Sequence, residues 1–213
     1  MIGAIAREAA AVPRILNALE TRGAAAGTWG RVQYDSRAVG AGDLFVAIPG
    51  AKVDGHAYLG AAHSKGALLA VVERFVPGET LPQVRVASAR RALAILAGEE
   101  NEHPSRELTM VGVTGTNGKT TTTHLVRAVL ERHGERVGVI GTVGYEFAGE
   151  RHAAAHTTPE APELARLLRA WRDHGADAVA MEVSSHALAL DRSYGIAFDA
   201  GVFTNLTQDH LDF

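Results

Sequence analysis

The chain has 213 residues, of which 46% are hydrophobic and 21% are charged, and its formal net charge is −3. This composition is typical of an ordinary soluble protein with room for one large domain or two small ones. The charge balance gives no support to a nucleic-acid partner, and the absence of cysteine excludes disulfides and thiolate metal sites.

Targeting and membrane signals are weak. The amino-terminal stretch MIGAIAREAAAVPRIL is interrupted by Arg7, Glu8 and Pro13, which makes it a poor secretion signal. No apolar run approaches the length of a membrane span. We therefore predict a cytoplasmic protein without membrane insertion, whose oligomeric state the sequence leaves open.

The first half of the chain alternates apolar runs with helical patterns, which indicates α/β architecture. Strands are predicted at residues 43–48, 67–73 and 83–88, and helices near residues 14–20, 58–65 and 89–99. A polar, proline-containing stretch at residues 99–107 then interrupts the pattern. We expect it to separate a domain of residues 1–103 from a second domain of residues 104–213.

The second half repeats the α/β rhythm. Strands are predicted at residues 108–115, 136–145, 176–184 and 198–206. The first is followed by a helix that Gly134 ends, with an apolar face of Leu125, Val126, Val129 and Leu130. A further helix, with Leu164, Leu167, Leu168 and Trp171 at helical spacing, is predicted to stop at Gly175.

The stretch GVTGTNGKTT at residues 112–121 predicts a phosphate-binding loop between a strand and a helix. Backbone amides of such a loop and of the first helical turn point toward an anion, and Lys119 supplies a charge near the β- and γ-phosphates. Thr120 is placed to ligate Mg²⁺ through its hydroxyl. A plain turn with capping threonines is the alternative, but it gives no reason for Gly-Lys-Thr at the helix start. The predicted nucleotide-binding residues are Gly115, Thr116, Asn117, Gly118, Lys119, Thr120 and Thr121.

The spacing of this loop departs from the usual P-loop, which would require glycine where Val113 stands. The variant TGTNGKTT resembles the ATP loop of the Mur ligase family, the amide-forming ligases of peptidoglycan (cell-wall) precursor synthesis. Three further stretches resemble family signatures in the right order, at residues 35–58, 181–188 and 203–213. With TTPE at residues 157–160, the pattern most closely resembles the member that adds the third peptide residue.

The resemblance implies a Rossmann-like UDP-binding domain at residues 1–103 and a P-loop mononucleotide-binding central domain at residues 104–213, incomplete at its carboxyl end. It implies catalytic roles for Lys119, Glu182 and His210, with Thr120 and Glu182 on a first Mg²⁺ and His210 on a second. A strand-end carboxylate is a suitable hard ligand, although such glutamates are often merely exposed. A lone histidine is more often structural, which is also our expectation for His186.

Substrate contacts are likewise implied by the resemblance. Thr157, Thr158, Ser184 and Arg192 would hold the muramoyl-dipeptide end of the substrate, although the threonine pair could equally cap a helix. The UDP moiety would meet Ser36 and the loop residues Ala51, Lys52 and Val53. Two departures affect the detailed contacts: His156 stands where asparagine is common, and Leu190 where glutamine is common.

The reaction implied is transfer of the γ-phosphoryl group of ATP to the D-glutamyl carboxylate of UDP-N-acetylmuramoyl-L-alanyl-D-glutamate. The amino group of a diamino acid would then attack the acyl phosphate. Lys119 and two Mg²⁺ ions would neutralise the approaching anions. The family pattern continues past Phe213 with a lysine and a third domain, so the resemblance implies a fragment that is inactive alone. Diaminopimelate, lysine and ornithine all stay open as the amino acid.

Other functions are compatible with parts of the pattern. Within the same class, the member adding the terminal dipeptide and folylpolyglutamate synthase are the alternatives. A P-loop kinase or NTPase should show the ordinary loop spacing, and Val113 argues against it. A nucleotide-sugar-binding module without catalysis is the non-enzyme alternative, against which the intact Lys119, Thr120 and Glu182 argue.

Overall fold

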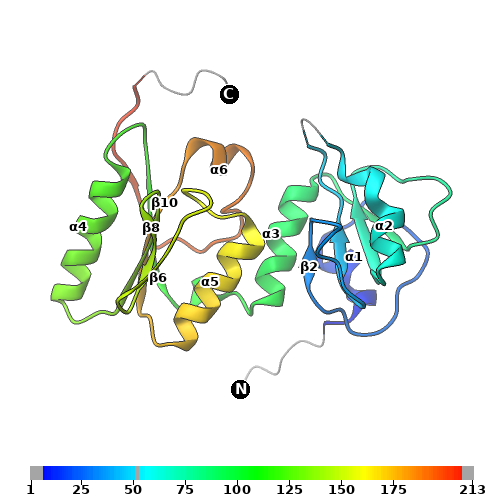
Figure 1. Cartoon of the computed structure of the whole chain (residues 1–213), viewed down its shortest axis with the longest axis horizontal. Coiled ribbons are helices and arrows are strands. Elements are labelled where there is room, and N and C mark those ends of the chain that lie inside the picture. Colours follow the sequence, from blue (N-terminus) through cyan, green and yellow to red (C-terminus); the bar gives the residue numbers. More distant parts are fainter. Residues whose placement is uncertain (1–6, 51–52, 208–213) are drawn as a thin grey trace. The chain divides into compact units, whose positions relative to one another are not determined.

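The computed structural model describes residues 7–50 and 53–207. The chain divides into two compact units, residues 1–100 and residues 101–213, and Figure 1 follows it through both. The boundary predicted after residue 103 lies close to this division. Each unit is built around a parallel-rich sheet with its own apolar core, so the predicted α/β class is confirmed.

The described part of unit 1 contains a five-stranded sheet in the order β1-β5-β4-β3-β2, with β1 antiparallel to β5 and the other pairs parallel. Its strands are β1 (Glu20–Arg22), β2 (Val32–Gln33), β3 (Leu44–Val46), β4 (Leu69–Val72) and β5 (Gln83–Arg85). Its helices are η1 (Ala9–Ala11), α1 (Val12–Ile15), η2 (Gly55–Tyr58), α2 (Leu59–Ser64) and α3 (Ala89–Glu100).

The sheet of unit 1 is covered on both faces. Successive strand residues point to opposite faces, so Leu44 belongs to the core beneath α3, while Phe45 belongs to the core beneath α2. Leu93 of α3 and Leu59 of α2 complete the two layers. Burial on both faces explains why these parallel strands read as continuous apolar runs.

The predicted strands of unit 1 are confirmed as β3, β4 and β5, but two features differ from prediction. The helix expected at residues 14–20 is wrong, because α1 ends at Ile15 and Glu20 already begins β1. Asn17, with φ of 47°, adopts a left-handed conformation that stops the helix. The two-residue strand β2 was too short to produce an alternation signal.

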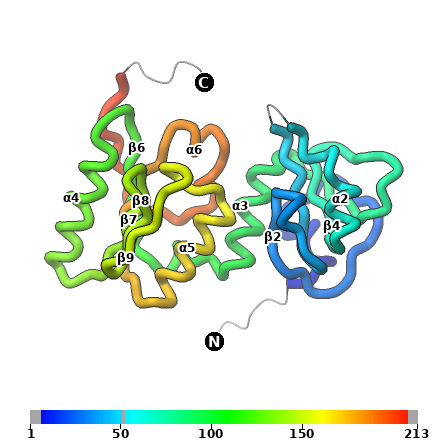
Figure 2. The backbone as a smooth tube through the Cα atoms, viewed as in Figure 1, coloured from blue at the N-terminus to red at the C-terminus, as the bar shows by residue number. Residues whose placement is uncertain are grey.

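The described part of unit 2 contains a six-stranded sheet in the order β11-β6-β10-β7-β8-β9. Its strands are β6 (Thr109–Thr114), β7 (Val137–Gly141), β8 (Gly144–Phe147), β9 (Glu150–His152), β10 (Ala178–Glu182) and β11 (Ala200–Phe203). The helices are η3 (Pro104–Arg106), α4 (Lys119–Arg132), α5 (Ala161–Asp173) and α6 (Ser185–Ala189). The four strands β11, β6, β10 and β7 are parallel, and Figures 1 and 2 show α4 and α5 on opposite sides of the sheet.

Helix α5 supplies much of the apolar core of unit 2. Its Leu164, Leu168 and Trp171 pack with Met110 of β6 and Ile140 of β7. The positions predicted to face the core in this helix therefore do so, and Gly175, with φ of 82°, follows its end as expected.

Helix α4 differs from its predicted orientation. Leu125 and Val129 are 61% and 59% exposed, while the buried residue of α4 is Thr123. The predicted apolar face is therefore wrong for Leu125 and Val129, whereas Val126 and Leu130 are half-buried. The difference arises because α4 packs on the sheet along a stripe that starts at Thr123. The strand predicted at residues 136–145 is also wrong as a single element, since β7 and β8 form a hairpin there.

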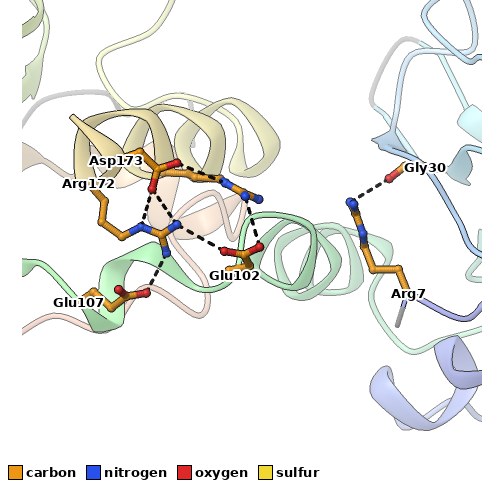
Figure 3. A network of polar contacts seen from close by, with 7 residues as sticks. Arg7, Gly30, Glu102, Glu107, Arg172 and Asp173 are labelled. Atoms are coloured by element: carbon orange, nitrogen blue, oxygen red, sulfur yellow. Dashed lines mark hydrogen bonds and ion pairs between the residues drawn. The ribbon is translucent and has the colours of Figure 1, made fainter. Parts of the chain in front are cut away.

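The segment that begins unit 2 is fixed to α5 by an ion-pair network (Figure 3). The guanidinium of Arg172 lies 2.8 Å from Glu107, 3.4 Å from Glu102 and 2.9 Å from Asp173.

In unit 1, Figure 3 also shows Arg7 donating to the Gly30 carbonyl, at 3.2 Å. Across residues 7–50 and 53–207, no helix is both long and apolar enough to cross a membrane.

Candidate nucleotide and substrate site

The phosphate-loop motif lies where β6 ends. Val113 is buried in the strand, and a Cβ added to Gly112 would lie 2.8 Å from the ring of Phe198, so both positions serve strand packing. The loop itself runs from Gly115, with φ of 130°, to Gly118, with φ of 85°. Both values favour glycine. The predicted strand, loop and helix are confirmed. Val113, which stands where the usual P-loop has glycine, is a buried residue of the strand and not part of the loop.

The amino end of α4 presents unpaired donors. Its first backbone hydrogen bond runs from the Thr122 amide to the Gly118 carbonyl. Within the described residues, the amides of residues 118–121 have no protein acceptor, and Gly118 at the N-cap offers no side chain. These amides and the positive end of the helix dipole are the features that bind phosphate in proteins.

The loop is fastened to the segment that follows β11. The Thr116 amide donates to the Asn205 carbonyl at 3.0 Å, and the Asn117 amide donates to Asn205 Oδ1 at 3.1 Å. Asn205 Nδ2 and Thr204 Oγ1 donate to the Asn117 carbonyl, at 3.1 and 2.6 Å. Thr207 exchanges two hydrogen bonds with Thr116. The expectation that all loop amides face an anion is therefore wrong for Thr116 and Asn117, whose amides hold the loop in shape.

Lys119 lies over its own loop. Its Nζ donates to the carbonyls of Gly115 and Thr116, at 2.7 and 2.8 Å. An ammonium group has three donors, so one N–H remains for a ligand when both of these bonds are kept. The charge is thus held at the loop, beside the unpaired amides of α4.

Glu182 closes the other side of this site from the end of β10, as predicted. The Thr120 hydroxyl donates to Glu182 Oε1 at 2.9 Å. Glu182 is 1% exposed, and in the described part of the chain no ion pair joins it to a basic side chain. A buried carboxylate without a cation is costly, and a carboxylate beside a hydroxyl is a hard-oxygen donor set of the kind that Mg²⁺ prefers. The residues present therefore fit Mg²⁺, which Thr120 and Glu182 would hold.

Thr158 and its neighbours surround the backbone of Glu182. The buried Thr158 hydroxyl donates to the Glu182 carbonyl at 2.9 Å and accepts from the Ser184 amide at 3.2 Å. Ser184 caps α6 by accepting from the Ala187 amide at 3.1 Å. The capping alternative for the threonine pair is wrong, since α5 has Glu160 at its N-cap and no side-chain cap. Thr158 therefore acts as a fixed part of the protein here.

Arg192 reaches the same region from the segment after α6. Its Nη1 donates to the Thr158 carbonyl at 3.2 Å. Its Nε lies 2.9 Å from Glu160 Oε1 as an ion pair, without the angle of a hydrogen bond. The guanidinium is thus positioned by the protein at the edge of the threonine pair.

His156 departs from the family pattern only in its side chain. Tyr145 donates its hydroxyl to the backbone carbonyl of His156 at 2.6 Å, a contact that any side chain at this position permits. Burial raises the pKa of Tyr145, so the hydroxyl stays protonated as a donor. The segment carrying Thr157 is therefore anchored through its backbone.

The substrate residues predicted in unit 1 lie on two loops. Ser36 is half-buried in a turn after β2, and Val53 is 55% exposed after β3. Ala51 and Lys52 lie outside the described residues, as does His210 in unit 2.

The turn that contains Ser36 is ordered by its charged neighbours. Asp35 Oδ2 pairs with Arg37 Nη2 at 2.7 Å, and Lys65 Nζ donates to the Arg37 carbonyl at 2.7 Å. The side-chain hydrogen bond from Arg37 lowers the pKa of Asp35 to about 2. This turn therefore stays anionic at Asp35 across the physiological range of pH.

Two residues of the site were not predicted. Thr142, directly after β7, contacts Glu182, and Asn205, after β11, contacts the phosphate loop. A signal for Thr142 existed, because polar residues at the carboxyl ends of neighbouring parallel strands converge on one edge. Asn205 lies in the stretch at residues 203–213 that resembles a family signature, but that stretch does not indicate its partner 88 residues away.

The fold and this site define a nucleotide-binding α/β protein whose phosphate loop follows a parallel strand. Two family models match the chain: "Mur ligase family, catalytic domain" over residues 30–101 and "Mur ligase middle domain" over residues 113–213. The chain belongs to the Mur ligase family.

Curated relatives agree with this assignment. The chain is 44% identical over 183 residues to a UDP-N-acetylmuramoyl-L-alanyl-D-glutamate--2,6-diaminopimelate ligase of Clostridium perfringens. The aligned region covers 85% of this chain and 38% of the relative. It is 46% identical over 202 residues to the protein of the same name in Geobacter metallireducens, covering 94% of this chain and 39% of the relative. The chain thus spans less than two fifths of the length of these relatives.

Solved structures resemble the chain as well. A UDP-N-acetylmuramoyl-L-alanyl-D-glutamate--2,6-diaminopimelate ligase superposes with a TM-score of 0.74 at 28% identity, over 86% of this chain and 38% of the other. A MurF ligase from Thermotoga maritima in complex with ADP gives 0.56 at 25% identity, over 85% of this chain and 38% of the other.

Proposed function

We propose that this chain binds ATP–Mg²⁺ in unit 2 and UDP-N-acetylmuramoyl-L-alanyl-D-glutamate, and that both sites serve the ATP-dependent addition of a diamino acid in peptidoglycan synthesis. The observation that carries the proposal is the Thr120 hydroxyl 2.9 Å from the buried Glu182 carboxylate, beside the loop held by Lys119. The names of the relatives favour 2,6-diaminopimelate as the amino acid. The proposal includes a cytoplasmic location, because the proposed reaction uses ATP and a UDP-linked precursor.

The chemistry requires activation of a carboxylate, which is a poor electrophile. A substrate carboxylate oxygen would bond to the γ-phosphorus of ATP while the bond to the β-phosphate oxygen breaks and ADP leaves. The amine would then attack the acyl carbon, and phosphate would leave. Bound Mg²⁺ supplies charge neutralisation for the phosphates.

The residues of this chain have distinct parts in that proposal. The amides at the start of α4 and Lys119 would orient the phosphates and offset their charge. Thr120 and Glu182 would hold the first Mg²⁺, and His210 would contribute to a second. The remaining substrate contacts would come from Ser36, Ala51, Lys52, Val53, Thr157, Ser184 and Arg192. The predicted contact from Thr158 is replaced by a supporting role, because its buried hydroxyl is bonded to the backbone of Glu182 and Ser184.

The alternative function is a nucleotide-sugar-binding module without catalysis. The paired Thr120 and Glu182 argue against it, because a module that binds only the UDP moiety has no need for a buried carboxylate beside a phosphate loop.

Equilibrium binding to the 213-residue chain tests the proposal. Isothermal titration should detect both ATP–Mg²⁺ and UDP-N-acetylmuramoyl-L-alanyl-D-glutamate. Lys119→Ala should lose ATP binding and keep the UDP-linked ligand, while Lys65→Ala serves as the matched lysine control for ATP. Binding of ATP alone would favour an NTPase, and binding of the UDP-linked ligand alone would favour the module.

A further inference from the structure

Thr142 contacts two groups to which the proposed function gives separate tasks. Its amide donates to Glu182 Oε1 at 3.0 Å, and its hydroxyl donates to Glu182 Oε2 at 3.3 Å. The same hydroxyl lies 3.0 Å from Thr157 Oγ1. One residue at the end of β7 thus joins the carboxylate of the metal site to a threonine of the substrate site.

The contacts of Thr142 fix the plane of the carboxylate. The terminal torsion of a glutamate is broad and needs contacts to define it. Thr120 holds only Oε1, whereas Thr142 reaches both oxygens, one through its main chain and one through its side chain. Since Glu182 has no ion pair within the described residues, these neutral donors set its orientation.

The backbone before Thr142 is shaped for the same carboxylate. A Cβ on Gly141 would lie 2.2 Å from Glu182 Oε1 and 2.9 Å from its Cδ. The carboxylate therefore rests directly on the Gly141 backbone, and no other residue type fits there without displacing it. This observation is independent of the hydrogen bonds of Thr142.

The number of hydroxyl protons available determines which group donates in each hydrogen bond among Glu182, Thr142 and Thr157. A carboxylate only accepts, so the single proton of the Thr142 hydroxyl is used toward Glu182. The Thr142 oxygen then accepts the proton of Thr157, whose oxygen is left with lone pairs for a ligand. Thr157 would therefore meet a donor group of the substrate, such as an amide N–H or a hydroxyl, rather than a carboxylate.

We propose that Thr142 is a positioning residue that orients the Glu182 carboxylate for the metal and makes Thr157 a hydrogen-bond acceptor toward the substrate. This inference rests on the proposed function, because it assumes a divalent cation at Glu182. Residues that orient metal ligands from outside typically change metal affinity by roughly 10- to 100-fold when they are removed.

The test uses Mn²⁺ as the metal probe, followed by electron paramagnetic resonance on the 213-residue chain with ATP. Thr142→Val keeps the amide but loses the hydroxyl, and it should weaken Mn²⁺ binding by roughly 10-fold or more. Thr142→Ser should restore affinity to within about threefold of the unaltered chain. Thr109→Val is the matched control, because Thr109 is exposed and its hydroxyl makes no hydrogen bond in the described part of the chain.

A double-mutant cycle tests the coupling to Thr157. Thr157→Val should reduce Mn²⁺ affinity when Thr142 is present and have no further effect in Thr142→Val, since the connection runs through that hydroxyl. Additive effects would overturn the coupling. Unchanged Mn²⁺ affinity in a folded Thr142→Val, or failure of Thr142→Ser to restore it, would overturn the positioning role. Absence of Mn²⁺–ATP binding by the unaltered chain would instead refute the proposed function, and this inference with it.

Discussion

Asn205 offers a direct way to perturb the phosphate loop without touching a group proposed to meet ATP. Asn205→Ala removes two hydrogen bonds with Asn117, both at 3.1 Å. In one, the backbone amide of Asn117 donates to Asn205 Oδ1; in the other, Asn205 Nδ2 donates to the backbone carbonyl of Asn117. The backbone bond from the Thr116 amide to residue 205 remains, as does the bond from Thr204 to the Asn117 carbonyl. The loop should therefore loosen rather than collapse.

The magnitude follows from the exposure of these bonds. A typical hydrogen bond contributes about 0.5–1.5 kcal/mol net, so two could account for about 1–3 kcal/mol. Both bonds are solvent-exposed, and the Asn117 carbonyl keeps its bond from Thr204, so we expect the lower end. If the bound conformation of the loop becomes less favourable by about 1 kcal/mol, the dissociation constant for ATP should rise roughly fivefold.

Titration of ATP–Mg²⁺ into the 213-residue chain by calorimetry measures this effect. Leu206→Ala is the matched control, because its side chain is 83% exposed and it neighbours the altered position. If Asn205→Ala bound ATP as tightly as Leu206→Ala and the unaltered chain, the loop would not depend on this fastening, and the reasoning would fail.

Three further outcomes are expected. Gly141→Ala should weaken ATP–Mg²⁺ binding, since its Cβ would lie 2.2 Å from the buried carboxylate of the metal site, and calorimetry measures the change. Gly138→Ala should lower the free energy of unfolding in urea by about 1–3 kcal/mol, because its Cβ would lie 2.4 Å from the Trp171 ring. The Asp35 carboxyl, whose pKa Arg37 lowers to about 2, stabilises the fold above pH 3.8, and this contribution is lost as pH falls toward 2; NMR titration should show the low midpoint, and Arg37→Ala should return it toward 3.8.

Gly201→Ala is the control for both glycine variants. A Cβ at Gly201 of β11 meets nothing within 4 Å, so ATP binding and urea stability should match the unaltered chain. Equal losses in all three variants would mean that the loss of glycine itself, rather than the steric contact, causes the effect.

The local parts of the site could be predicted from the sequence. Gly115 and Gly118 mark a loop that needs positive φ, and Lys119 follows at the helix start, so strand, loop and helix are encoded within one short segment. Glu182 could be placed at the end of a strand because β10 is a continuous apolar run that stops there.

The remaining parts depend on contacts between distant segments. The role of Thr142 required the hairpin of β7 and β8, whose turn lies inside an apolar stretch that looked like one strand. The outward orientation of Leu125 depends on how α4 docks on the sheet, which periodicity alone does not define. Likewise, nothing near Asn205 in the sequence signals its partner 88 residues away.

The long separation of these contacts has a consequence for how the site assembles during folding. Thr120 meets a carboxylate 62 residues further along the chain, and Asn117 meets its amide partner 88 residues away. Contacts of this range form late, because each must close a large stretch of chain first. Competence to bind nucleotide should consequently emerge in one cooperative step with completion of the sheet, and a nascent chain that has only synthesised the loop and its helix should have none.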